Sequence, residues 1–482
     1  MSLVERVHIA RRFQLSIRID SDLRDPGAID GYVCPKSSGQ VLVSMAECVE
    51  RNGQGAFTWT GPYGGGKSSL ALILSALIGP DKLLRNAAAA SFDSQTLSSL
   101  SGAFRPRKLG WRVLPVIARR AEPAAVFGEA IDRCGLRPVL DDAKWNDDSV
   151  VTALTELAMQ EPLERGGLVV FVDEMGKFLE AAANDNADLY FFQLLAEAAN
   201  RSSGRLILVG ILHQSFTEYA RTLSTGVRDE WAKVQGRFVD LALNVSGDEQ
   251  IELISRAIQV DAVPEKVDPQ FATAIQAVRT GRANNSPDLE SILARCWPLH
   301  PVVASLLGPI SRRRFGQNQR SLFGFLNSAE PYGFQDFLKI ADEGSIYYPD
   351  RLWDYLSANL EPAILASPDG HRWSTAVDAI DRCSEIGAGE LHVQLLKTIA
   401  LMQMFRERAN VIASPKLLAA CVSATIDSAS VESALDDLRK WSFVIFKKHV
   451  GAFAIYAGSD FDIDQAVTES LKAVHDLKFN EL

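Results

Sequence analysis

The stretch FTWTGPYGGGKSSLAL (residues 57–72) places four glycines, one lysine and two serines between two apolar runs. Within it, residues 61–68 fit the pattern G-x-x-x-x-G-K-[ST] at every specified position. Glycines allow the backbone to fold so that successive N–H groups point inward at an anion, and the following helix adds its positive N-terminal end. The stretch therefore predicts a strand, a phosphate-binding loop and a helix, in that order.

The polar residues of this loop have expected roles in binding ATP and Mg²⁺. Lys67 is placed to reach the β and γ phosphates, and so counts as a catalytic residue, whereas Ser68 is placed to bind Mg²⁺ through its hydroxyl. A glycine-rich turn that binds nothing is the alternative, but the strand before the loop and the helix after it favour nucleotide binding. The predicted ATP-binding residues are Gly61, Pro62, Tyr63, Gly64, Gly65, Gly66, Lys67, Ser68 and Ser69.

A pair of acids follows a second apolar run. In VVFVDE (residues 169–174), four apolar residues precede Asp173 and Glu174. Ligands of open α/β sheets lie at the carboxyl ends of the strands, so we expect both carboxylates beside the glycine loop. Asp173 is predicted to bind Mg²⁺, mostly through water, and Glu174 to act as general base on the water that attacks the γ-phosphate. Acids in the first turn of a helix are the alternative.

Four apolar runs are predicted strands, at 56–61, 111–118, 166–174 and 205–213. Continuous apolar strands that alternate with helices indicate a parallel sheet covered on both faces. The last run ends with His213 and Gln214, and either side chain is expected to help place the attacking water. A structurally satisfied histidine is the alternative.

Two arginines are candidates for stabilising charge on the γ-phosphate. Arg237, in EWAKVQGRFVDLAL (residues 230–243), precedes an apolar strand-like run and is expected to serve the nucleotide of the same chain or of a neighbour. Arg320, in SRRRFGQNQRSLFGFL (residues 311–326), is the candidate arginine of a helical lid over the nucleotide. Surface arginines are the alternative for both. If Arg237 acts in a neighbouring chain, the active form is a homo-oligomer.

The strand pattern ends near residue 246, and helical segments follow it. Three helices and two short strands near the end of the chain give the outline of a winged helix. The predicted domains are a lead-in segment 1–56, an ATPase core 57–245, a helical lid 246–330, a helical connector 331–390, a winged helix 391–460 and a C-terminal helix 461–482, interpreted as a linker to a missing part.

Composition disfavours several classes of protein. The chain has 482 residues, 47% of them hydrophobic and 23% charged, which is typical of soluble globular proteins with more than one domain. Its six cysteines stand singly, so neither a zinc site nor a disulfide framework is expected. Without a membrane-length apolar run or a leader, we expect a cytoplasmic protein with no membrane partner. The net charge of −10 disfavours general nucleic-acid binding but allows a local basic patch.

The order of these stretches resembles that of large prokaryotic P-loop ATPases encoded in anti-phage defence loci, including BREX-type ATPases, and more broadly the AAA+ and STAND group. The stretches concerned are RRFQLSIRIDSDL (11–23), GPYGGGKSS (61–69), VVFVDEMGKFLE (169–180), EWAKVQGRFVDL (230–241) and CWPLHPVVASLLGPISRRRFGQNQRSLFGFL (296–326). The resemblance implies an α/β P-loop NTPase with an αβα parallel sheet, followed by a helical lid and a winged-helix domain. It also implies ATP-driven assembly or switching beside an effector such as a nuclease. Known members are often longer than this chain.

Three functions remain open. The first is a Mg²⁺-dependent ATPase whose hydrolysis drives conformational change in a defence complex. The second is a DNA-binding ATPase of the origin-recognition or helicase-loading type, with phosphate contacts from Arg439, Lys440, Lys447 and Lys448 in the winged helix. The third is a nucleotide-sensing scaffold with little turnover. Substitution of Glu174 separates the third function from the first.

Overall fold

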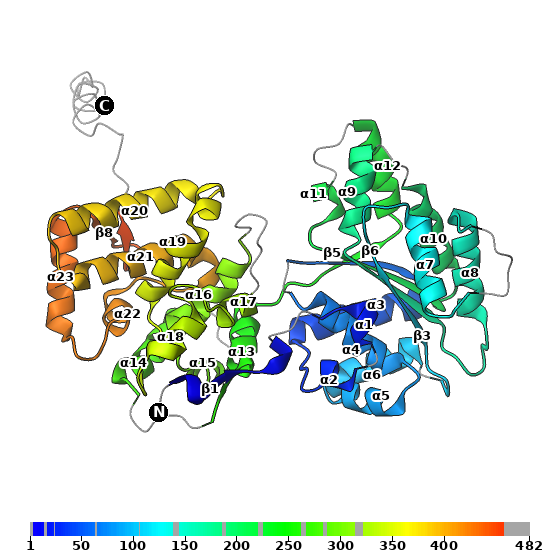
Figure 1. The fold of residues 1–482 in the computed structure, drawn as a ribbon, viewed down its shortest axis with the longest axis horizontal. Helices are drawn as coiled ribbons and strands as arrows, with labels where there is room; N and C mark the ends of the chain where they lie inside the picture. The colour runs from blue at the N-terminus through cyan, green and yellow to red at the C-terminus, as the bar shows by residue number, and fades with distance from the viewer. Residues whose placement is uncertain are drawn as a thin grey trace, which may run out of the picture. The chain divides into compact units, whose positions relative to one another are not determined.

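A computed structural model gives the fold of this chain (Figure 1). The residues that it describes are 3–13, 17–23, 25–62, 65–105, 107–137, 144–185, 189–219, 225–261, 267–282, 287–313 and 322–456. They form two compact units. We call them the sheet unit, Val7–Val260 with Gln319–Asn327, and the helical unit, Met1–Arg6 with Asp261–Asn318 and Ser328–Leu482.

The sheet unit is built on five parallel strands in the order β3-β4-β5-β2-β6. They are β2 (Ala56–Thr60), β3 (Arg112–Ile117), β4 (Leu168–Asp173), β5 (Leu206–Leu212) and β6 (Val239–Ala242). β5 pairs in parallel with both β2 and β4. The strand before the glycine loop and the strand before the acid pair are therefore separated by β5, whose end lies between theirs.

Helices cover both faces of this sheet because its strands are apolar on both sides. In β4, Val170 and Val172 belong to one hydrophobic core, whereas Val169 and Phe171 belong to the other. The first core contains α7 (Pro123–Arg133), α8 (Asp147–Met159), α9 (Gly176–Asp185) and α10 (Tyr190–Arg201). The second contains α1 (Ile19–Asp22), α2 (Pro26–Ile29), α3 (Lys36–Asn52), α4 (Lys67–Ile78), α5 (Lys82–Ala89) and α6 (Ser94–Phe104). The predicted αβα parallel sheet is thus confirmed (Figure 1).

Segments outside the predicted core also belong to the sheet unit. They include β1 (Val7–Ile9), η2 (Arg11–Phe13), α13 (Gly247–Ala257), β7 (Ile258–Val260) and α17 (Leu322–Leu326). Within the predicted core, the unit also contains α11 (Phe216–Tyr219) and α12 (Thr225–Gln235). β1 pairs antiparallel with β7. The ring of Phe13 lies 4.5 Å from that of Phe323, and the Asn327 side-chain amide donates to the Phe13 carbonyl. The compact unit therefore extends beyond 57–245, while the predicted domain limits stay predictions.

The helical unit begins with η1 (Leu3–Glu5) and consists mainly of helices packed on one another. They are α14 (Pro269–Thr280), α15 (Leu289–Ala294), α16 (Pro301–Ser311), α18 (Phe334–Ile340), α19 (Pro349–Leu365), α20 (Gly370–Glu385), α21 (Glu390–Ala409), α22 (Pro415–Ala420) and α23 (Ser428–Lys440). A hairpin of β8 (Val444–Lys447) and β9 (Ala452–Ile455) follows α23. This order of three helices and a hairpin is the one that the sequence predicts for a winged helix.

Two further expectations concern the C-terminal residues and membrane-spanning helices. The predicted C-terminal helix 461–482 lies outside the described residues. Across the described ranges, no helix combines the length and the apolar character needed to cross a membrane.

Candidate active site

The glycine loop joins the end of β2 to the start of α4. Gly66, the residue before α4, has a φ of 76°, in the left-handed region that favours glycine. A Cβ on Gly61 would lie 2.6 Å from the carbonyl oxygen of Leu243, so a larger residue does not fit there. Two glycines of the motif are therefore required by the backbone itself. Tyr63 and Gly64 lie outside the described residues.

Lys67 is the first residue of α4 and is buried, with only 4% of its surface exposed. Its ammonium donates to the carbonyl oxygens of Gly61, at 2.6 Å, and Pro62, at 2.7 Å. Burial lowers the pKa of Lys67 to about 8, and the nearby Asp173 carboxylate opposes this shift. The lysine is thus folded back on the loop carbonyls, at the place where its charge can meet a phosphate.

Ser68 and Asp173 lie far apart in the sequence but meet in the structure. The Ser68 hydroxyl donates to Asp173 Oδ2 at 3.0 Å, because β2 and β4 end at the same edge of the sheet. Asp173 Oδ1 accepts from the backbone N–H of Glu174 at 2.9 Å. Burial raises the pKa of Asp173, while the Ser68 hydroxyl acts in the opposite direction. The two predicted magnesium ligands therefore share one small polar cluster beside the loop.

Glu174 lies in the turn between β4 and α9, and its backbone is unusual. Its φ of 54° is in the left-handed region, which a residue with a side chain rarely adopts. Its carboxylate forms an ion pair with the ammonium of Lys177, and both side chains are half-exposed. Lys177 was not among the predicted site residues. Its spacing of three from Glu174 is the signal that points to it in the sequence.

Two further glycines, which the sequence analysis did not single out, allow this turn to pack tightly. A Cβ on Gly210 of β5 would lie 2.2 Å from the sulfur of Met175, and one on Gly176 would lie 2.1 Å from the hydroxyl of Tyr219. The backbone N–H of Met175 also donates to the Ile211 carbonyl at 3.1 Å. The turn that carries Glu174 is therefore fixed against β5 and the segment after it.

His213 and Gln214 follow β5, whose end lies between the ends of β2 and β4. Both residues are half-buried. Their place in the sheet is the predicted one, between the glycine loop and the acid pair. Ser69 is half-buried in the first turn of α4.

Arg237 lies at the opposite edge of the sheet from the glycine loop. The parallel register pairs Phe57 with Val239, so Arg237 is level with residue 55, before β2 begins. Gly61 is six residues farther along β2, or about 20 Å at the usual rise of a strand. The Arg237 guanidinium instead pairs with Glu197 at 2.7 Å. The structure therefore does not bring Arg237 to the loop of its own chain.

Arg320, the candidate lid arginine, lies outside the described residues. The oxygen donors of the cluster fit Mg²⁺, which prefers carboxylate and hydroxyl oxygens together with phosphates and water. In the part of the chain that the structure describes, no group of three or more His, Cys, Asp or Glu side chains could hold a metal by itself. A Mg²⁺ ion at Ser68 and Asp173 would accordingly depend on oxygens from the nucleotide.

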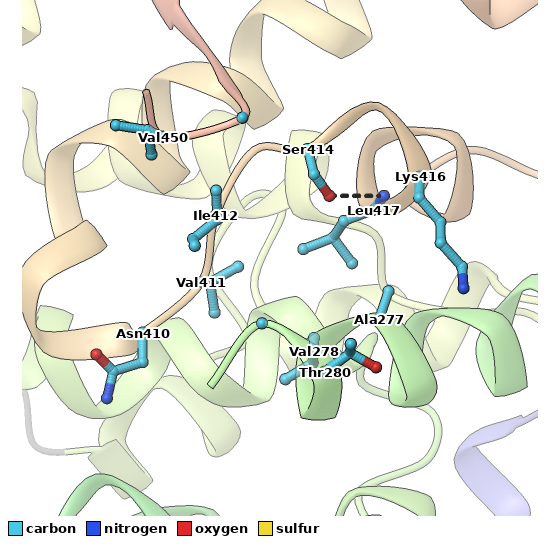
Figure 2. A pocket seen from close by; sticks show the side chains of 12 residues that line it. Ala277, Val278, Thr280, Asn410, Val411, Ile412, Ser414, Lys416, Leu417 and Val450 are labelled. Carbon is cyan, nitrogen blue, oxygen red and sulfur yellow. Dashed lines mark hydrogen bonds between the residues drawn. The ribbon is translucent and has the colours of Figure 1, made fainter. Parts of the chain in front are cut away.

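The helical unit contains a separate pocket of about 200 Å³, shown in Figure 2. It lies between the end of α14, the segment that joins α21 to α22, and the turn of the hairpin. Lys416 is the one charged residue of the twelve that line it. The Ser414 hydroxyl at its wall accepts from the Leu417 N–H and caps α22. This pocket lacks the pairing of acid and ammonium groups found beside the glycine loop.

No protein-family model matches this chain, and no curated protein matches it. Among solved structures, the ORC2 protein of Aeropyrum pernix in ADPNP–ADP complexes is 13% identical, over 97% of this chain and 99% of its own, with a TM-score of 0.35. Drosophila ORC bound to DNA is 13% identical over 89% and 93%, with a TM-score of 0.31. PCH-2 of C. elegans is 11% identical over 67% and 73%, with a TM-score of 0.26. At these scores the likeness carries no argument about ligands or partners.

Proposed function

We propose that this chain is a Mg²⁺-dependent ATPase that couples ATP binding and hydrolysis to conformational switching or assembly of a complex. The observation that carries the proposal is the hydrogen bond between Ser68 and Asp173 at the mouth of the glycine loop. It joins two motifs that were predicted separately, one for phosphate and one for metal. A buried lysine at the same place adds the charge that a triphosphate requires.

In this proposal, the backbone N–H groups of the loop and Lys67 bind the phosphates of ATP. Lys67 exchanges its contacts with the Gly61 and Pro62 carbonyls for contacts with phosphate oxygens. Ser68 and Asp173 hold Mg²⁺, which neutralises part of the phosphate charge when it is bound. Glu174 orients the attacking water and accepts its proton, and His213 or Gln214 helps to place that water.

Arg237 then acts on a neighbouring copy of the chain, because it lies at the far edge of its own sheet. An arginine contributed in this way stabilises charge on the transferred phosphoryl group. The active form is therefore a homo-oligomer. By the resemblance described above, we place this activity in the cytoplasm, in an anti-phage defence complex with an effector protein such as a nuclease.

The test compares ATP binding and phosphate release by the full chain and its variants in the presence of Mg²⁺. Lys67→Ala should weaken ATP binding by about 100-fold, because a hydrogen bond to a charged group contributes up to about 3 kcal/mol. Glu174→Gln should retain ATP but lower turnover by about 10²- to 10⁴-fold. Lys82→Ala is the matched control, since Lys82 is also the first residue of a helix but is exposed.

Three outcomes would contradict the proposal. They are a wild-type chain that fails to retain ATP at millimolar concentrations, a Lys67→Ala variant that binds ATP as the wild type does, and a Glu174→Gln variant with an unchanged rate. Retention of ATP with no turnover in the wild type would favour the nucleotide-sensing scaffold instead.

Contact with DNA is a second candidate function, and one observation favours it at the hairpin. Lys447 and Lys448 lie at the hairpin turn and form no ion pair within the described part of the chain. On α23, in contrast, Arg439 pairs with Asp436 at 3.1 Å and Lys440 pairs with Asp437 at 3.2 Å. Of the four basic residues predicted to contact DNA, we therefore propose only the two at the hairpin turn.

A further inference from the structure

We propose that Lys177 is a positioning residue that restrains Glu174 and keeps the rate of ATP hydrolysis low. This inference rests on the ATPase function proposed above. The ion pair between the Glu174 carboxylate and the Lys177 ammonium spans three residues, from the turn after β4 into the first turn of α9. When this ion pair is formed, the predicted general base is bound to Lys177, and the site hydrolyses ATP slowly.

The backbone of the turn directs the two acids to different partners. Asp173 accepts from the Ser68 hydroxyl and faces the glycine loop. Glu174, with its φ of 54°, turns its carboxylate toward Lys177 instead. A residue with a side chain holds a left-handed backbone only where its surroundings compensate for the strain, and such residues gather at functional sites. The carboxylate predicted to act on water is thus held by a group with no part in the reaction.

The chemical consequence follows from the charge of Lys177. An ammonium that donates to a carboxylate occupies one of its acceptor oxygens and offsets the negative charge that polarises a water molecule. While the ion pair is formed, that carboxylate oxygen is not available to orient the attacking water. The pair is half-exposed, with 38% of the Glu174 side chain and 46% of the Lys177 side chain accessible, so a modest change at the site can break it.

A second ion pair on α9 separates this effect from general stabilisation of the helix. Arg120 pairs with Glu180 of α9 at 3.6 Å, and Glu180 is three residues beyond Lys177. Loss of the Arg120 pair removes an exposed ion pair from the same helix and leaves Glu174 untouched. Arg120→Met is therefore a matched control for Lys177→Met.

The experiment measures kcat, the KM for ATP, the Kd for ATP and the melting temperature of the full chain and its variants. Lys177→Met should raise kcat by about 2- to 5-fold, the factor that the strength of an exposed ion pair allows. The Kd for ATP should change by less than about 2-fold, because the partner of Lys177 is Glu174 and not one of the predicted ATP-binding residues that the structure describes. Lys177→Arg should restore the wild-type rate, and Arg120→Met should not alter it. The gain should disappear when Glu174→Gln is combined with Lys177→Met.

The possible results distinguish failure of the proposed restraint from failure of the ATPase function. A lowered or unchanged kcat in Lys177→Met, with a wild type that hydrolyses ATP, overturns the proposed restraint and leaves the ATPase function standing. A gain that persists with Glu174→Gln also overturns it, since the effect would not pass through Glu174. ATP binding without hydrolysis in both the wild type and Lys177→Met overturns the ATPase function, and the restraint with it. An equal fall of the melting temperature in Lys177→Met and Arg120→Met shows that both chains fold and that helix stability does not explain the gain.

Discussion

The sheet unit and the helical unit both bury ionisable side chains, but they satisfy them in different ways. In the sheet unit, Lys67 and Asp173 are held by loop carbonyls and a serine hydroxyl, partners that a phosphate or a metal can replace. In the helical unit, His300 is fully buried; its Nε2 lies 2.9 Å from the Ala420 carbonyl oxygen, and its Nδ1 accepts from the Val302 N–H. Burial of a polar group therefore does not by itself indicate a site: Lys67 and Asp173 lie beside the glycine loop, whereas His300 is enclosed by helices of its own unit.

The largest effect expected from this comparison is a loss of ATPase activity in a variant of the sheet unit. Arg237→Ala should lower kcat by about 10³-fold, because it removes charge stabilisation at the γ-phosphate. Mixing Arg237→Ala with Lys67→Ala chains should recover part of the activity if each site combines residues of two copies. Phosphate release by the separate variants and by their mixture measures both effects.

Arg201→Ala is the control for this experiment. Arg201 contacts the same acid, Glu197, at 4.0 Å, but its side chain is 83% exposed. This variant should keep the wild-type rate. A wild-type rate in Arg237→Ala would remove Arg237 from the mechanism, and a mixture without recovered activity would argue against a shared site.

The next effect concerns stability and belongs to the helical unit. Burial lowers the pKa of His300 to about 4 from its usual 6.5, although the Ala420 carbonyl opposes the shift. Between these two pH values the unfolded chain binds the proton and the folded chain does not, so stability falls as the pH falls. The loss attributable to His300 should reach roughly 3 kcal/mol at pH 4.

Denaturant unfolding at pH 7 and pH 4 measures this loss. Unfolding is monitored by near-ultraviolet circular dichroism, to which the stacked Trp353 and Trp373 of the helical unit contribute, with ring centroids 4.1 Å apart. His300→Gln should be less stable at pH 7 but should lose less stability on acidification than the wild type. The exposed His371 supplies the control variant, His371→Gln, which should behave as the wild type does. Equal acid sensitivity in His300→Gln and the wild type would contradict the prediction.

The sequence predicted the parts of the site that depend on strand ends. Asp173 and Ser68 meet because parallel strands end at one edge, and a run of apolar residues reveals where a strand ends. The position of Arg237 could not be predicted, because it depends on the register of β6 against β2. The pairing of Glu174 with Lys177 was missed because a spacing of three indicates a pair only within one helix, and Glu174 lies in the turn before α9 with a left-handed backbone.

The smallest expected effect concerns basic residues at the surface of the helical unit. Binding of duplex DNA, measured by fluorescence anisotropy over a series of salt concentrations, should weaken in Lys447→Ala and Lys448→Ala. Each substitution should reduce the slope of log K against log salt by about 1, because each lysine removes one phosphate contact. Lys440→Ala is the control, since Lys440 is neutralised by Asp437 on α23. If the wild type fails to bind DNA at low salt, the hairpin has no role in DNA contact.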